Sequence, residues 1–480
     1  MNTFYKIFCF IMLLYGFTSC KKDKLITDSG AKISFSNDTL TFDTVFVNLG
    51  STTQFFTIRN QNKQPINISK IKLAGGDGSN FRINVNGDAV SEAANIIIPA
   101  KDSIYVFVEV TVDPSKGKLP FVLFDSIQLE TNGNKQQVIL QAWGQNAHFF
   151  NGEEIETQTW SDDLPYVILN SMVVKTGHTL TINQNADVYM GPNSGTFVEG
   201  NVNILGGIDS ADYVVFRGLR LDNDLDGTPY DIIPGQWLGI FLLRGSQGNT
   251  IENSELRNGS YGINLGSASI EDIPNISVAN APDLSLKNVV IKNMAFYALF
   301  GFLSIVNAEN VLLHSTGLST LAVQVGGDYS FTHCTFYNRG NQYLEHKDPM
   351  VYLSNFFEDR DNNLLIRADL TKADFVNCII EGSLEEELVF DPAEGAQGTA
   401  GFNKQFENCI LKTKLDISDP SFADCKKNLD IKFLDRLKNN FRLTAESPAK
   451  DAGITTAVLF DLDNQMRDAN PDIGVYEFIP

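Results

Sequence analysis

The chain has 480 residues, of which 43% are hydrophobic and 20% are charged, and its formal net charge is -21 at pH 7. This composition excludes wholesale disorder, and the length favours several domains or one domain joined to a repeat array. The acidity argues against nucleic acid as a partner, because phosphate backbones bind clustered Lys and Arg.

The N-terminus, "MNTFYKIFCFIMLLYGFTSCKKDK", places Lys6 before an apolar run from Ile7 to Phe17. That run is too short to span a bilayer, so residues 1–19 are predicted to be a signal peptide and residues 20–30 a linker. "FTSC" resembles the lipobox of bacterial lipoproteins, which implies that Cys20 carries lipid and anchors the protein to the outer membrane of a cell envelope, on the periplasmic or the cell-surface side. An ordinary secretory signal with an incidental cysteine is the alternative.

Residues 31–146 alternate between apolar and polar side chains, most clearly in "IYVFVEVTVDP". There one strand face carries Ile104, Val106, Val108, Val110 and Val112. Short turn-rich strands of this kind predict an immunoglobulin-like β-sandwich. The segment resembles the immunoglobulin-like modules of the ASPM, SPD-2 and hydin type, which implies a spacer or adhesion role without catalytic residues.

A hexapeptide with a polar third position recurs after residue 146, and its clearest copies are "IENSEL" (251), "LKNVVI" (286), "AENVLL" (308), "FTHCTF" (331), "FVNCII" (375) and "FENCIL" (406), with a degenerate "LSNFFE" at 353. The starts at 286, 308, 331, 353 and 375 are 22 or 23 residues apart. A fixed interval of this length without a helical period predicts a solenoid of short strands, a parallel β-helix over residues 147–436. The predicted fold is therefore all-β.

The polar third position predicts a sharp corner between two strands, because Asn tolerates the left-handed backbone conformation. The array resembles the right-handed parallel β-helix superfamily that includes the pectate lyases, in which Asn residues stack at one corner. That resemblance implies a corner role for Asn253, Asn288, Asn310, Asn355, Asn377 and Asn408, with His333 as a departure.

The cysteine that directly follows the corner residue is predicted to point into the core as a small apolar filler. Cys334, Cys378 and Cys409 would then form one column. Two intervals separate Cys334 from Cys378, which at about 4.8 Å per coil places them near 10 Å apart and disfavours a disulfide.

Residues 437–480 end the chain with Ser447 to Gly453 and Asp472 to Glu477, in the patterns Ser-Pro-Ala-x-Asp-x-Gly and Asp-Ile-Gly-x-Tyr-Glu. These resemble the closing segment of many bacterial exported β-helix proteins. The segment is expected to cap the last coil.

"DNDLDG" at 222–227 copies the start of a calcium loop, with alternate carboxylates at Asp222, Asp224 and Asp226. Asp231 is a candidate fourth ligand for Ca²⁺, because the twelfth position of an EF-hand loop is here Ile233. A solvated surface loop is the alternative.

Trp237, Tyr343 and Tyr352 are candidates for stacking on sugar rings, and packing in the core is the alternative for such aromatic residues. A uronate lyase would need a cation and a basic side chain. The basic residues available, without a recognisable motif, are Arg217, Arg220, Arg244, Arg257 and Lys292. The carboxylate run at 385–387 is expected to be a solvated loop, so no catalytic residue is identified.

These patterns together predict a monomeric, lipid-anchored envelope protein that binds a polysaccharide or adheres through the lateral face of its β-helix. A uronate polysaccharide lyase or related carbohydrate-active enzyme is the first alternative, and a structural envelope protein is the second. Calcium is the one cofactor that the sequence suggests.

Overall fold

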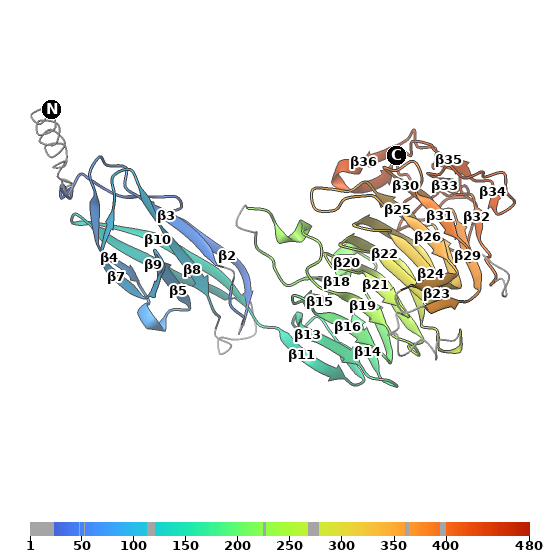
Figure 1. Ribbon diagram of the computed structural model, residues 1–480, viewed down its shortest axis with the longest axis horizontal. Helices are drawn as coiled ribbons and strands as arrows, with labels where there is room; N and C mark the ends of the chain where they lie inside the picture. The colour runs from blue at the N-terminus through green and yellow to red at the C-terminus, as the bar shows by residue number, and fades with distance from the viewer. Residues whose placement is uncertain are drawn as a thin grey trace, which may run out of the picture. The chain divides into compact units, whose positions relative to one another are not determined.

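The computed structural model describes residues 24–47, 49–51, 53–112, 121–223, 227–266, 278–360, 364–393 and 400–480. Within these ranges the chain forms strands and turns without any α-helix, so the all-β prediction is confirmed. The 3-10 helices are η1 (Gly76–Gly78), η3 (Ser210–Asp212), η4 (Tyr230–Ile232), η6 (Val278–Asn280) and η7 (Arg436–Lys438). Two compact units divide the chain, Met1–Asn146 and Ala147–Pro480 (Figure 1).

The first unit is built from two five-stranded sheets. One contains, in spatial order, β1 (Ser34–Phe35), β3 (Gln54–Arg59), β8 (Ser103–Val110), β5 (Phe81–Val85) and β6 (Asp88–Val90). The other contains β2 (Thr39–Phe46), β10 (Asn134–Gln145), β9 (Phe121–Thr131), β4 (Ile66–Leu73) and β7 (Glu92–Ile98). Phe42 of one sheet contacts Phe81 of the other, with ring centroids 5.9 Å apart. The five alternating residues from Ile104 to Val112 are all buried, as their spacing predicts, because successive side chains of a strand point to opposite faces.

The second unit is a parallel β-helix, as the repeats predict (Figure 1). Its 23-stranded sheet consists of β11 (His148–Ile155), β12 (Gln158–Trp160), β13 (Tyr166–Val174), β14 (Thr179–Asn183), β15 (Asp187–Met190), β16 (Gly195–Val198), β17 (Asn201–Leu205), β18 (Val214–Gly218), β19 (Gly239–Leu242), β20 (Asn249–Arg257), β21 (Ile263–Leu265), β22 (Asp283–Met294), β23 (Leu299–Thr316), β24 (Leu321–Thr332), β25 (Thr335–Asn338), β26 (Val351–Ser354), β29 (Leu370–Val376), β30 (Ile379–Gly382), β31 (Leu388–Asp391), β32 (Gln405–Glu407), β33 (Ile410–Leu411), β34 (Phe422–Ala423) and β35 (Lys426–Lys427).

Each coil passes through three faces, which we number by the strands that define them. The first face contains β16, β19, β21, β26 and β31, the second contains β14, β17, β29 and β32, and the third contains β15, β18, β25 and β30. The longer strands β20, β22, β23 and β24 bend at the corners and belong to more than one face. Apolar side chains from all three faces fill the interior of the coils.

The corner between the second and third faces is the predicted Asn column. A positive φ of 46° to 55° is adopted by Asn253, Asn288, Asn310, His333, Asn377 and Asn408. Their side chains form a ladder between coils: the amide of Asn288 donates to Asn253 at 2.9 Å, and the amide of Asn310 donates to Asn288 at 3.0 Å. The corner role is confirmed for these six positions.

The prediction is wrong for Asn355, whose φ is not positive. The strand that precedes it, β26, pairs with β24 on the first face, where Leu353 lies opposite Val323. The interval of 22 residues is coincidental here, because residues 339–350 and the hairpin of β27 (Phe356–Asp359) with β28 (Leu364–Arg367) are inserted into this coil. The chain therefore needs 44 residues to pass from His333 to the next corner residue, Asn377.

The same insertions change the spacing of the cysteines. Thr335 pairs with Ile379, Ile379 with Ile410, and Ile410 with Lys426, so the residues just before them lie on four successive coils. Those residues are Cys334, Cys378, Cys409 and Cys425, all of them free thiols. The predicted column is confirmed, and the first three members are fully buried. The expected separation of two coils between Cys334 and Cys378 is wrong, since they are on neighbouring coils.

The C-terminal residues lie along the side of the β-helix as well as beside its last coils. They follow the antiparallel pair of β36 (Phe433–Asp435) and β37 (Asn440–Leu443). The side chain of Asn377 donates to the carbonyl of Ile454 at 2.7 Å, and that of Asn310 donates to the carbonyl of Phe460 at 2.7 Å. The segment thus covers the Asn corner of several coils, which the expectation of an end cap did not include.

In the part of the chain that the structure describes, no helix has the length and hydropathy needed to cross a lipid bilayer.

Candidate functional site

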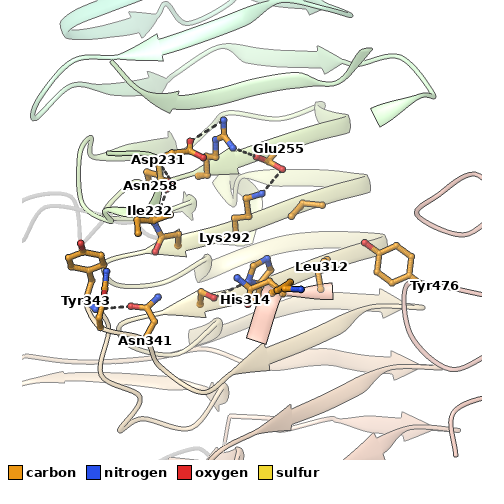
Figure 2. A pocket seen from close by; sticks show the side chains of 17 residues that line it. Asp231, Ile232, Glu255, Asn258, Lys292, Leu312, His314, Asn341, Tyr343 and Tyr476 are labelled. Carbon is orange, nitrogen blue, oxygen red and sulfur yellow. Dashed lines mark hydrogen bonds and ion pairs between the residues drawn. The ribbon is translucent and has the colours of Figure 1, made fainter. Parts of the chain in front are cut away.

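A groove of about 590 Å³ lies on the outer side of the third face (Figure 2). Its floor is formed by outward-pointing residues of β20, β22 and β23 on successive coils. Arg257 pairs with Lys292, and Lys292 pairs with His314, so these three side chains form one row across the coils. Because the coils stack, residues that are far apart in the sequence lie on neighbouring strands, about 4.8 Å from one another.

The sequence contained a signal for this row. Each of its members lies four residues after a corner residue: Arg257 after Asn253, Lys292 after Asn288, and His314 after Asn310. Side chains alternate between the interior and the surface along a strand, so a fixed offset from the corner fixes the direction. The buried positions of the repeats do not by themselves reveal this row of surface residues.

Ion pairs connect the charged residues of the groove into one network. Arg257 contacts Asp231 through one guanidinium nitrogen and Glu255 through the other, each at 3.2 Å. Lys292 binds the second oxygen of Glu255 at 2.8 Å, and Arg217 binds Asp231 at 3.0 Å. Figure 2 shows the Glu255 and Lys292 side chains directed toward each other. Cations and carboxylates thus alternate along the surface, as needed to bind a ligand with both donors and acceptors.

Burial changes the protonation equilibria at the edge of this network. It lowers the pKa of Arg217, and the neighbouring charge of Arg257 lowers it further, against the opposing effect of Asp231. Burial also raises the pKa of Asp187, which the charges of Arg217 and Arg257 partly offset.

His314 at the floor of the groove is uncharged at neutral pH. Burial lowers its pKa to about 3, with a smaller contribution from the charge of Lys292. Its Nδ1 lies 2.9 Å from the hydroxyl of Ser315, and its ring packs edge-on against Phe441 at 5.1 Å. A neutral, fixed imidazole contributes a polar surface rather than a charge.

Two loops form the walls of the groove. On one side, the side chain of Asn341 accepts a hydrogen bond from the backbone N–H of Tyr343 at 2.8 Å and holds that residue at the rim, where 39% of it is exposed. On the other side, the C-terminal residues contribute Lys438 and Tyr476. Figure 2 shows Tyr343 and Tyr476 on opposite sides of the charged row.

The three aromatic candidates from the sequence have different surroundings. Tyr343 lines the groove, as described above. Trp237 is buried, with 1% exposed, and its indole N–H donates to the carbonyl of Arg257 at 2.9 Å, so the prediction that it contacts a ligand through an exposed face is wrong. Core packing, the alternative for these aromatic residues, therefore accounts for Trp237.

Tyr352 belongs to a separate cavity of about 590 Å³ on the first face, beside the β27–β28 hairpin. It is half-buried, and its hydroxyl donates to Asp391 at 2.6 Å. The structure therefore does not bring Tyr352 and Tyr343 together.

Two of the calcium candidates are engaged with arginines. Arg220 binds Asp222 through two nitrogens, at 2.9 and 2.8 Å, and Asp231 accepts from Arg217 and Arg257. Asp224 and Asp226 lie outside the described residues, as does the lipidation candidate Cys20. Within the described ranges, no group of three or more His, Cys, Asp or Glu side chains is arranged to hold a metal ion.

The carboxylate run at 385–387 is not a uniformly solvated loop, contrary to expectation. Glu387 is fully buried, and its two oxygens lie 2.9 and 3.0 Å from Nε2 of His346. It also accepts from the backbone N–H of Leu384 at 2.8 Å. These contacts give Glu387 a structural role in the turn between the third and first faces.

A strip of aromatic residues, which the sequence analysis missed, begins around the corner from the groove. We call it the aromatic strip, and it consists of Phe197, Phe241, Tyr261, Phe296, Tyr297 and Phe300. Neighbouring ring centroids are 4.9 to 6.0 Å apart, and 42% of Phe296 is exposed. Tyr261 and Phe296 each lie three residues after a residue of the groove, Asn258 and Asn293 respectively.

No protein-family model matches the chain, and no curated protein matches it. The solved structures give weak likenesses. One is the catalytic domain of a GH87 α-1,3-glucanase, at 9% identity with a TM-score of 0.21, covering 80% of this chain and 87% of that chain.

A second likeness is a family 123 glycoside hydrolase from Clostridium perfringens, at 10% identity with a TM-score of 0.19, covering 27% of this chain and 30% of that chain. A third is the PapD-like domain 7 of human CEP192, at 13% identity with a TM-score of 0.17, covering 26% of this chain and 91% of that domain. Likenesses of this strength assign neither a family nor an activity, so the site is interpreted from its own geometry.

Proposed function

We propose that the β-helix unit binds a glycan chain in the groove of the third face. The supporting observation is the ion-pair network of Asp231, Arg257, Glu255 and Lys292 along the groove, with the exposed ring of Tyr343 at its rim. Sugars present hydroxyl groups that both donate and accept hydrogen bonds, along with apolar ring faces. Charged groups of both signs and a flat aromatic side chain complement these two kinds of surface.

The aromatic strip extends the proposed surface around the corner onto the first face. A chain of several sugar units would then contact polar groups in the groove and aromatic rings beyond it. This arrangement favours an extended polymer over a single small sugar as the ligand.

A glycan array followed by calorimetric titration of the best ligand tests the proposal. We expect Tyr343→Ala and Lys292→Met to weaken binding about 3- to 10-fold each, because each removes one contact worth roughly 1 kcal/mol. Lys372→Met is the matched control, since Lys372 pairs with Asp374 at 3.9 Å on the second face. An array without any binding would favour a purely structural envelope protein instead.

A polysaccharide lyase is the second candidate, and the neighbouring cations Arg257 and Lys292 on successive coils of the groove are the observation that favours it. Such an enzyme needs positive charge beside the uronate carboxylate and a basic side chain that abstracts the neighbouring proton. Incubation with uronate polysaccharides tests this. Unsaturated products from the wild type, absent with Lys292→Met, would assign the groove to a lyase.

We further propose that the protein is exported and anchored through a lipid on Cys20. The lipobox-like "FTSC" supports this proposal. Metabolic labelling with palmitate should mark the wild type and leave Cys20→Ala unlabelled. Label on the variant would contradict the assignment.

A further inference from the structure

The four free thiols of the β-helix unit form one continuous stack. Cys334, Cys378, Cys409 and Cys425 occupy the same register on successive coils. The backbone N–H of Cys378 donates to the sulfur of Cys409 at 3.4 Å, and the backbone N–H of Lys426 donates to the carbonyl of Cys409 at 2.8 Å. Cysteines at the same register of strands about 4.8 Å apart fall within the range of Cα separations that a disulfide spans.

The members of the stack differ in their access to solvent. Cys334, Cys378 and Cys409 are fully buried, whereas Cys425 is only partly buried. Cys425 also lies between two strands of two residues each, β34 and β35, at the end of the parallel sheet. Short terminal strands adjust their backbone more easily than strands held on both sides, because fewer hydrogen bonds must change.

The residues that follow Cys425 favour attack by an anionic oxidant. Lys426 and Lys427 are exposed. Their positive charge attracts an anionic disulfide to the exposed end of the stack. The neighbouring Cys409 and burial raise the pKa of Cys425, so access to solvent, and not a lowered pKa, makes it the first thiol of the stack to meet an oxidant.

We propose that Cys409 and Cys425 are an oxidisable pair that forms a disulfide and links the last two coils of the β-helix. The Cys425 thiolate attacks a small disulfide such as oxidised glutathione and releases one reduced thiol. The Cys409 thiol, after losing its proton, then displaces the second. Two protein thiols are oxidised to one disulfide, and one oxidant disulfide is reduced to two thiols.

Peptide mapping of the native full-length chain tests the proposal. The protein is treated with oxidised glutathione, its remaining thiols are alkylated in denaturant, and it is digested with trypsin. Cleavage after Lys404, Lys412, Lys414 and Lys426 places Cys409 and Cys425 on separate peptides, 405–412 and 415–426. We expect these two peptides to be recovered linked, with Cys334 and Cys378 alkylated.

Two variants control the assignment. Cys425→Ser should lose the linked peptide while keeping the melting temperature of the reduced wild type, because Cys425 is partly exposed. Cys334→Ala, at the far end of the stack, should keep the link. Oxidation of the wild type should raise the apparent Tm by roughly 2 °C or more, since the link restrains the unfolded chain.

Other outcomes overturn the proposal. These are an alkylated Cys425 after oxidation, a mixed disulfide with glutathione that never resolves onto Cys409, or a link between Cys378 and Cys409. A linked peptide that appears only after denaturant is added would also overturn it, because it would arise from the unfolded chain.

Discussion

The side-chain amide of Asn377 donates to Nε2 of His333 across 3.0 Å, although 44 residues separate the two. Both residues have a positive φ, and both lie at the corner between the second and third faces. The same Asn377 side chain accepts from the backbone N–H of Ile454 at 3.0 Å. One corner residue therefore joins two coils and the C-terminal segment.

Two substitutions of Asn377 separate what its left-handed backbone conformation and its side-chain hydrogen bonds each contribute to the free energy of unfolding. We expect Asn377→Gly to lower the free energy of unfolding by roughly 1–3 kcal/mol, because it keeps the left-handed conformation but leaves polar partners unsatisfied. Asn377→Ala should cost about 1 kcal/mol more, since a Cβ is strained at positive φ. Urea denaturation of both variants measures the difference. Equal losses would show that the backbone conformation contributes nothing.

Truncation of Trp237 should lower the stability of the protein, whereas truncation of Tyr343 should weaken glycan binding. Trp237→Ala removes a fully buried indole, so it should cost about 3–5 kcal/mol of stability. Tyr343→Ala changes an exposed side chain and should alter stability by less than about 0.5 kcal/mol, while weakening the glycan binding proposed above. Thermal unfolding and calorimetric titration of both variants provide the comparison. A stable Trp237→Ala variant would contradict the burial of this residue.

Glu381 should make stability depend on pH. Burial raises its pKa from 4.5 to about 7, against the opposing charge of Arg436, which lies 3.2 Å away. The folded state therefore binds this proton more tightly than the unfolded state. The resulting stabilisation is complete below about pH 4.5 and is lost as the pH rises through about 7.

Glu381→Gln removes this dependence. We expect the stability of the variant relative to the wild type to increase between pH 4.5 and pH 8 by at most about 3 kcal/mol. Glu385→Gln is a control of opposite sign, because a hydrogen bond with Lys414 lowers the pKa of Glu385. Denaturant titrations of both proteins at several pH values measure this change, and a stability difference between Glu381→Gln and the wild type that stays constant with pH would contradict the prediction.

The aromatic strip should contribute to glycan affinity without contributing much to folding. We expect Phe296→Ala to weaken binding of a long oligosaccharide about 3- to 10-fold and to leave binding of a disaccharide unchanged, because short ligands end within the groove. Leu205→Ala is the matched control, since Leu205 is 38% exposed at the end of β17 on the second face. Equal effects of the two substitutions would argue against a role for the strip.

The sequence by itself determined the all-β fold, the parallel coils and the corner positions of Asn253, Asn288, Asn310, His333, Asn377 and Asn408. These follow from local rules: alternation sets strand faces, and an Asn between two short strands marks a left-handed corner. The buried cysteine column followed from the same register. Local sequence patterns are sufficient to predict residue positions wherever successive coils have the same length.

Only the tertiary structure decided which coils are neighbours where the chain is interrupted. The insertions between His333 and Asn377 keep an interval of 22 residues by coincidence, so Asn355 was misplaced and the cysteines were placed too far apart. The groove likewise depends on stacking, because Arg257, Lys292 and His314 become one row only when β20, β22 and β23 pair in register. Sequence separation does not encode that pairing when loops of unequal length lie between the strands.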